Sequence, residues 1–178
     1  IRPHFPHAKV LREQDGDAPA EWRREAFGIM RDTPALIWLP LTKRIGNAVD
    51  MAEDSGGLPP NASLGATFGD QADYDRDRIK LAHAAIELDP LFTFGSFEPL
   101  LGPVILDRHA PDWVIVGGES GRNARPMELD WARSLKRQAG DLRRVFNFKQ
   151  VGGRSSDKGG HLLDGVAYFA RPRVNVLT

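Results

Sequence analysis

The sequence predicts an α/β fold built on a parallel sheet. Short apolar segments of strand length alternate with longer segments in which apolar residues recur at helical spacing. The apolar runs favour strands that are buried on both faces. Polar or glycine residues follow these runs, at the end of the sheet where (β/α) barrels carry their sites. We therefore predict a single domain over residues 18–178, arranged as a partial or degenerate TIM-like (β/α) barrel.

The N-terminal part begins with an irregular, proline-rich arm over residues 1–17. A helix capped by Asp17 follows, and it ends before Pro34 because the residue preceding a proline avoids the helical conformation. The apolar run over 36–41 predicts a strand, and residues 45–54 predict a helix that the following glycines and prolines end.

The central part contains the clearest helix, over residues 70–87, which follows a strand over 63–68. Asp70 lies at the start of this helix, where a carboxylate interacts favourably with the helix dipole. The spacing of three apolar residues predicts the face that packs on the sheet. These residues are Ile79, Ala82 and Ile86.

Three further elements are expected after the central helix: strands over 91–97 and 113–116, then a helix over 129–142. Residues 145–148 form the last convincing strand, and residues 166–177 give no clear pattern. The apolar residues of the helix over 129–142 recur on one face. They are Ala132, Leu135, Ala139 and Leu142.

Composition limits the classes of function. Lysine plus arginine and aspartate plus glutamate number 24 each, so the net charge does not indicate nucleic acid as a partner. The sequence shows no apolar run of the roughly 20 residues that a membrane span needs, so a cytoplasmic location is expected. The sequence contains no cysteine, which excludes disulfides and thiolate-held metals within these 178 residues. His4 and His7 lie in the arm without a third ligand nearby, so we expect no metal site.

The candidate site residues follow five consecutive predicted strands, whose carboxyl ends meet at one edge of a parallel sheet. Glu98, Glu119 and Lys149 are the candidate catalytic residues. The candidate cofactor-binding residues are Lys43, Ser96, Gly117, Gly118 and Arg125. A structural explanation stays open for each group. Glu98 can serve as the partner of Lys149, the two glycines can form a tight turn, and the basic residues can be solvated.

Several sequence blocks occur in a characteristic order: Leu41 to Arg44, Ser96 to Pro103, Trp113 to Gly121, Ala124 to Met127, Phe148 to Gln150 and Leu163 to Gly165. This set resembles an uncharacterised phage and prophage protein family related to radical S-adenosylmethionine enzymes. The resemblance implies a TIM-like barrel, a phage-encoded protein, S-adenosylmethionine as cofactor, and an iron–sulfur cluster held by cysteines upstream. It also implies that Glu119 and the Gly117-Gly118 backbone meet an amino-acid moiety, and that Lys43, Arg125 and Lys149 meet anionic groups.

The chain departs from the family pattern at two positions. Ala139 stands where the family tends to have a cysteine, and Gly69 where a glutamate is usual. Without cysteines, an iron–sulfur cluster is not supported by this chain. We expect a C-terminal portion or a cluster-less relative of such an enzyme, without independent radical chemistry.

Two alternatives stay open: an interaction or phage assembly module, and an acid–base enzyme using Glu98 and Glu119. An exposed Trp22 or Trp131 on a polar helix face would favour the module. A partial barrel leaves strand edges to cover, by the arm, a second copy or a missing N-terminal half.

Overall fold

The computed structural model describes residues 20–174. The predicted arm over 1–17, including Asp17, lies outside this range. The elements follow in the order α1 (Ala20–Arg31), β1 (Leu41–Thr42), the 3-10 helix η2 (Ile45–Asn47), α2 (Ala48–Glu53), β2 (Leu64–Thr67), α3 (Gln71–Leu88), β3 (Thr93–Phe97), β4 (Trp113–Gly117), α4 (Leu129–Asp141), β5 (Val145–Gln150), β6 (Leu162–Leu163) and β7 (Val166–Ala167).

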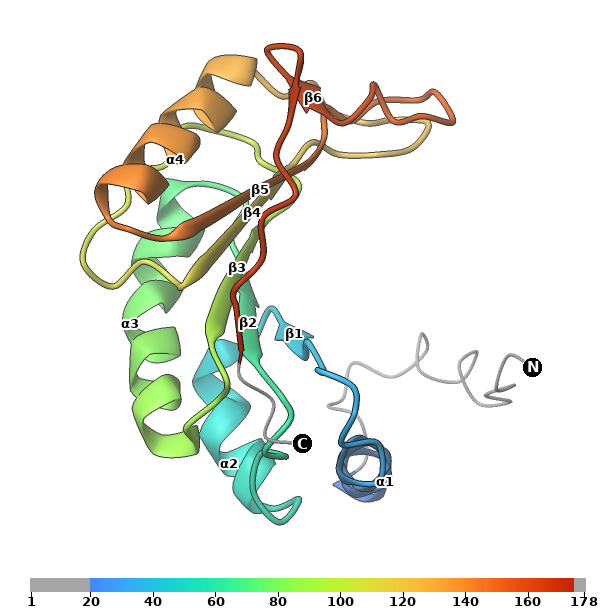
Figure 1. Cartoon of the computed structure of the whole chain (residues 1–178), viewed down its shortest axis with the longest axis vertical. Coiled ribbons are helices and arrows are strands. Elements are labelled where there is room, and N and C mark those ends of the chain that lie inside the picture. Colours follow the sequence, from blue (N-terminus) through green and yellow to red (C-terminus); the bar gives the residue numbers. More distant parts are fainter. Residues whose placement is uncertain (1–19, 175–178) are drawn as a thin grey trace.

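Strands β1 to β5 form one parallel sheet, in which each strand lies beside its neighbours in sequence. This confirms the predicted α/β class and the parallel strands. The sheet is open, with β1 and β5 at its edges, so the five strands do not close into a barrel (Figure 1). The edge of β5 is joined by the C-terminal segment, through an antiparallel bridge between Asn147 and Phe169 and a hydrogen bond from the Phe148 N–H to the Tyr168 carbonyl (2.8 Å).

The core lies between the sheet and helices α3 and α4, which lie together on one side of the sheet in Figure 1. The central strand β3 is buried at four consecutive positions, as the apolar runs predict. In β4, by contrast, Val114 and Val116 are buried, whereas Ile115 between them is only half-buried. The expectation of burial on both faces therefore holds best at the centre of the sheet.

The predicted inner face is correct for α4 and wrong for α3. In α4, Ala132, Leu135 and Ala139 are buried. In α3, Ile86 is 80% exposed, and the buried face carries Tyr74 and Leu81 instead. This helix has apolar residues on two sides, and the aromatic contacts of Tyr74 with β3 and the residue after β2 select the side that packs. The Tyr74 ring lies 5.4 Å from that of Phe68 and 6.2 Å from that of Phe97.

Two segments differ from the sequence-based elements. The strand expected over 36–41 is reduced to β1, with one isolated bridge between Trp38 and Ala62. Proline at position 40 has no N–H for a strand ladder, which limits pairing there. The hairpin of β6 and β7 was not predicted. Its turn, Asp164-Gly165, has left-handed φ values of 55° and 77°, the signature of a tight hairpin turn.

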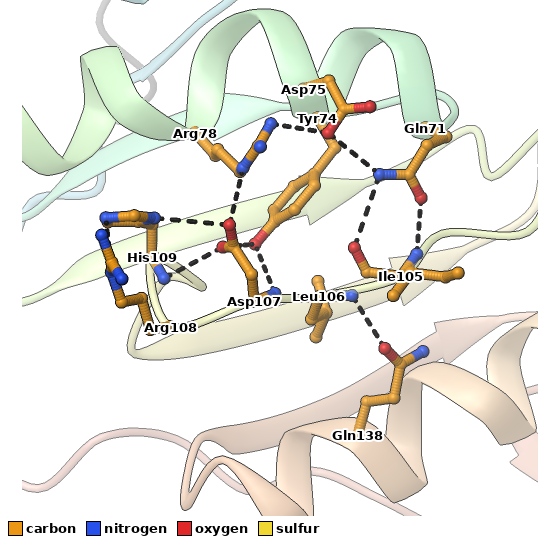
Figure 2. Close-up of polar contacts among 10 residues, drawn as sticks. All are labelled: Gln71, Tyr74, Asp75, Arg78, Ile105, Leu106, Asp107, Arg108, His109 and Gln138. Carbon is orange, nitrogen blue, oxygen red and sulfur yellow. Dashed lines mark hydrogen bonds and ion pairs between the residues drawn. The ribbon is translucent and has the colours of Figure 1, made fainter.

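The connection from β3 to β4 contains an extended segment instead of a helix, and polar side chains of α3 and α4 hold it (Figure 2). The Tyr74 hydroxyl donates to the Asp107 carboxylate (3.0 Å), and Arg78 contacts the same carboxylate (2.9 Å). Burial raises the pKa of Tyr74 above its usual value. Burial alone would also raise the pKa of Asp107, but hydrogen bonds from Arg78, the His109 backbone, Tyr74 and the His109 ring lower it to about 2.

Candidate ligand-binding site at the ends of strands β3 to β5

The carboxyl ends of β3, β4 and β5 bring three separate parts of the sequence together. Glu98 directly follows β3, Gly117 ends β4, and Lys149 and Gln150 end β5. Because the strands are parallel and adjacent in the order β3-β4-β5, these residues share one end of the sheet. The sequence-based expectation of a common polar end is met for these residues.

Glu98 and Lys149 form the centre of the cluster. The Lys149 Nζ lies 2.8 Å from Glu98 Oε2 and 3.1 Å from Oε1. The Glu98 side chain is 20% exposed, whereas that of Lys149 is 52% exposed. An ion pair with one half-exposed partner contributes at most about 1 kcal/mol. A ligand could therefore separate the two side chains at small cost.

Gln150 holds the Glu98 carboxylate from the buried side. Its Nε2 donates to Glu98 Oε1 (3.0 Å) and to Ser120 Oγ (2.7 Å), and it also lies 3.2 Å from the Gly118 carbonyl. Gln150 is 5% exposed, so its amide is fixed by these contacts. One oxygen of Glu98 is thus positioned by a buried neutral donor, while both oxygens face the more exposed Lys149.

The two glycines at the end of β4 have different structural roles. A side chain at Gly117 would begin 3.3 Å from Glu98 Cδ, so the missing side chain leaves room for the Glu98 carboxylate. A side chain at Gly118 would collide with the Val151 carbonyl oxygen. Gly118 also donates its N–H to the Gln150 carbonyl (3.0 Å), which continues the pairing of β4 and β5 beyond the strands. The space beside Gly118 is therefore occupied by backbone.

Glu119 and Arg125 form a pair of their own in the loop after β4. Arg125 binds both carboxylate oxygens of Glu119, at 2.8 and 3.0 Å, and its backbone N–H adds a third contact at 2.9 Å. The hydrogen bonds from the Arg125 side chain, followed by the one from its backbone, lower the pKa of Glu119 to about 2. A carboxylate held in this way stays ionised at neutral pH, so the contacts favour a role in shaping the loop over proton transfer.

The remaining candidates lie further from the cluster centre. Lys43 follows β1, and four interstrand spacings of about 4.8 Å separate β1 from β5. Ser96 is buried in β3, two residues before Glu98. The structure thus groups Glu98, Lys149 and Gly117, and places Lys43 at the opposite edge of the sheet.

Sequence reasoning left Gln150 and Ser120 out of the site. Gln150 directly follows Lys149, and Ser120 directly follows Glu119. Their positions at the ends of predicted strands were the signal that could have identified them. Neither residue type is charged, and only the tertiary structure shows that one buried amide connects them to Glu98.

The Glu98–Lys149 pair can bind a ligand group that carries one positive and one negative charge. Glu98 offers a carboxylate to an ammonium group, and Lys149 offers an ammonium to a carboxylate. Residues 20–174 contain no group of three or more His, Cys, Asp or Glu side chains that could hold a metal ion. Within the same range, no helix combines the length and the apolar composition that a membrane span requires.

A comparison with protein families finds a match over residues 12–172 to a family described as "Protein of unknown function (DUF5131)". The chain belongs to this family. The match covers all five strands of the sheet and all residues of the Glu98 cluster, so the candidate site lies within the matched region. No curated protein and no solved structure matches the chain.

Proposed function

We propose that this DUF5131 protein contributes the ligand-binding half of a radical S-adenosylmethionine-type (β/α) barrel, in which the Glu98–Lys149 pair binds the amino-acid part of S-adenosylmethionine. The observation that carries the proposal is the charge pair at the ends of adjacent parallel strands, with Glu98 fixed by the buried Gln150. An α-amino acid group is a zwitterion and matches both charges. The sequential order of the five strands is the order found in TIM-type barrels, which supports the barrel half.

The fit differs between the two cofactors that the resemblance implies. The α-ammonium of S-adenosylmethionine can bind Glu98 and its carboxylate can bind Lys149, so the side chains fit this molecule. An iron–sulfur cluster does not fit, because the 178 residues contain no cysteine to supply thiolates. Bound S-adenosylmethionine would supply a sulfonium centre, and this chain's contribution is to hold and orient its amino-acid end. A phage origin is part of the same proposal and rests on the resemblance alone.

The alternatives have weaker support. An exposed Trp22 or Trp131 would favour an interaction module, but both are partly buried, and Trp131 packs against the core. Acid–base catalysis by Glu98 and Glu119 requires a carboxyl group that exchanges its proton near neutral pH. The pKa of Glu119, at about 2, is shifted in the direction opposite to the one a general acid needs.

A calorimetric titration with three ligands tests the proposal. We expect saturable binding of S-adenosylmethionine and of its homocysteine analogue, which both carry the amino-acid group. Adenosine lacks that group, and we expect it to bind at least about tenfold more weakly, the equivalent of one lost charge-assisted contact. Equal binding of adenosine would contradict the role of the charge pair, and absence of binding by all three would contradict the proposal as a whole.

A further inference from the structure

The segment that leads into β1 pairs with β2 through every second residue. The Trp38 carbonyl accepts from the Ser63 N–H (2.8 Å), and the Pro40 carbonyl accepts from the Gly65 N–H (2.9 Å). Pro40 has no N–H of its own, and this missing donor lies on the side that faces β2. The proline therefore removes no donor from the outer edge of the segment.

Three residues of this segment direct their backbone groups to the outer edge of the sheet. Successive residues of an extended segment point their N–H and C=O groups to opposite sides, so Ile37, Leu39 and Leu41 face away from β2. Among residues 20–174, no backbone hydrogen bond is found at Ile37 or Leu39, and the register of Leu41 with Gly65 places Leu41 on the same outer side. The edge thus offers donors and acceptors at regular spacing to a further strand.

The side chains of the same three residues are apolar and exposed. Ile37 is 39% exposed, Leu39 43% and Leu41 49%. Proteins usually protect a free sheet edge with a charged residue, a proline or a bulge at the positions that face outward. None of the three outward-facing residues is charged or a proline. This edge therefore favours pairing with another strand.

The opposite edge of the sheet is already occupied. The C-terminal segment lies along β5, where the Phe148 N–H donates to the Tyr168 carbonyl (2.8 Å). A second copy is therefore blocked from joining its β1 to β5 in a head-to-tail arrangement. The pairing that stays open between two copies joins their β1 edges about a two-fold axis, which gives a closed dimer (Figure 1).

The three outward-facing residues complement themselves when two copies pair antiparallel around Leu39. Leu39 then lies opposite Leu39 of the other copy, and Ile37 lies opposite Leu41 of the other copy. Each facing pair exchanges two backbone hydrogen bonds, with Cα atoms about 5.5 Å apart. The apolar side chains meet on one face of the joined sheet, as stabilising cross-strand pairs do.

We propose that two copies of this chain join their sheets through the edge of β1, as a two-fold dimer with antiparallel pairing centred on Leu39. The inference goes beyond the proposed function and does not rest on it. In the chain on its own, the second copy occupies the edge at which the other half of a barrel would join. The Glu98–Lys149 pair lies toward the opposite edge of the sheet, so the dimer leaves it accessible in both copies.

Single-cysteine variants test the pairing and its register, because the chain has no cysteine of its own. Leu39→Cys should form a disulfide-linked dimer on oxidation, since a Cα separation of about 5.5 Å suits a disulfide. Ile37→Cys should not cross-link with itself, but should cross-link when mixed with Leu41→Cys. Ile86→Cys, at an 80% exposed position of α3, is the control and should stay uncross-linked. Cross-linking of Ile37→Cys with itself as readily as Leu39→Cys would overturn the proposal.

Analytical ultracentrifugation tests the dimer without a cross-link. The wild-type chain should form a dimer at about 100 μM that dissociates on dilution. Leu39→Lys and Leu39→Glu should each weaken dimerisation at least about tenfold, because like charges then face each other. An equimolar mixture of the two should dimerise again, which also shows that both variants are folded. The control Ile86→Lys should dimerise as the wild type does. A monomeric wild type, or undiminished dimerisation of Leu39→Lys, would overturn the proposal.

Discussion

Gln71 of α3 and Gln138 of α4 bind the same stretch of extended backbone from opposite sides. Gln71 accepts from the Ile105 N–H (2.6 Å) and Gln138 accepts from the Leu106 N–H (2.7 Å). Their amide groups also donate to backbone carbonyls, Gln71 to Ile105 (3.4 Å) and Gln138 to Val104 (2.9 Å). The two side chains replace the backbone partners that a strand or helix would supply (Figure 2).

This arrangement predicts a clear order of stability effects. Gln138→Ala should lower the free energy of unfolding by about 1–3 kcal/mol, because it leaves partly buried backbone groups without partners. Gln71→Ala should cost less, because its contacts are exposed and water can replace them. Urea denaturation measures both. Arg137→Ala, on the outside of α4, is the control and should change stability by less than about 0.5 kcal/mol; equal effects of all three variants would contradict the account.

The Asp107 network predicts a contribution to acid sensitivity. The folded-state pKa of Asp107 is about 2, below the value of roughly 3.9 for an unfolded chain. A lowered pKa contributes stability that is present above about pH 4 and is lost as the pH falls toward 2. The difference in unfolding free energy between wild type and Asp107→Asn should therefore shrink over this window. A difference that stays constant from pH 5 to about pH 2 would show that the charge of Asp107 is not responsible.

The neighbouring glycines at the end of β4 should respond differently to the same substitution. Gly118→Ala places a methyl group on the Val151 carbonyl and should destabilise the fold by about 1–3 kcal/mol or more. Gly117→Ala brings a methyl group within 3.3 Å of Glu98 and should displace that side chain, so binding of S-adenosylmethionine should weaken more than the melting temperature falls. Thermal melts and calorimetry of both variants distinguish these effects. Equal destabilisation with equal loss of binding would contradict the assigned roles.

The two apolar sides of α3 offer a further test. Ile86→Gln should change the unfolding free energy by less than about 0.5 kcal/mol, because the side chain is 80% exposed. Leu81→Ala, on the buried side, should cost about 2–5 kcal/mol. Chemical denaturation of the two variants measures the difference. A large loss on replacing Ile86 would mean that this side of the helix is covered in solution.

The same helix shows how far sequence alone can predict this fold. Periodicity located α3 and its first turn, where Asp70 accepts the Asp73 N–H (3.0 Å). It could not choose between the two apolar sides, because that choice depends on Phe68, which follows β2, and Phe97 of β3, which both pack against Tyr74. For α4, whose apolar residues lie on one side only, the predicted face was correct.

The candidate site was predictable to a similar degree. Parallel strand order follows from the alternation of strands and helices, and it was sufficient to bring Glu98 and Lys149 to one end of the sheet. The sequence does not give the distance between strand ends across the sheet. Lys43, which follows β1 at one edge, was therefore grouped with residues that lie toward the other edge. The role of Gln150 depends on a partly buried hydrogen bond between residues 52 positions apart, which no local pattern encodes.

Calorimetric titration of S-adenosylmethionine into wild type, Lys149→Met and Arg122→Gln measures the contribution of the charge pair most directly. Arg122 is an exposed cation in the loop after β4, so its replacement controls for a general loss of positive charge. We predict that Lys149→Met weakens binding at least about tenfold, whereas Arg122→Gln stays within about twofold of wild type. Equal affinities of wild type and Lys149→Met would contradict the proposal that Glu98 and Lys149 form the binding site.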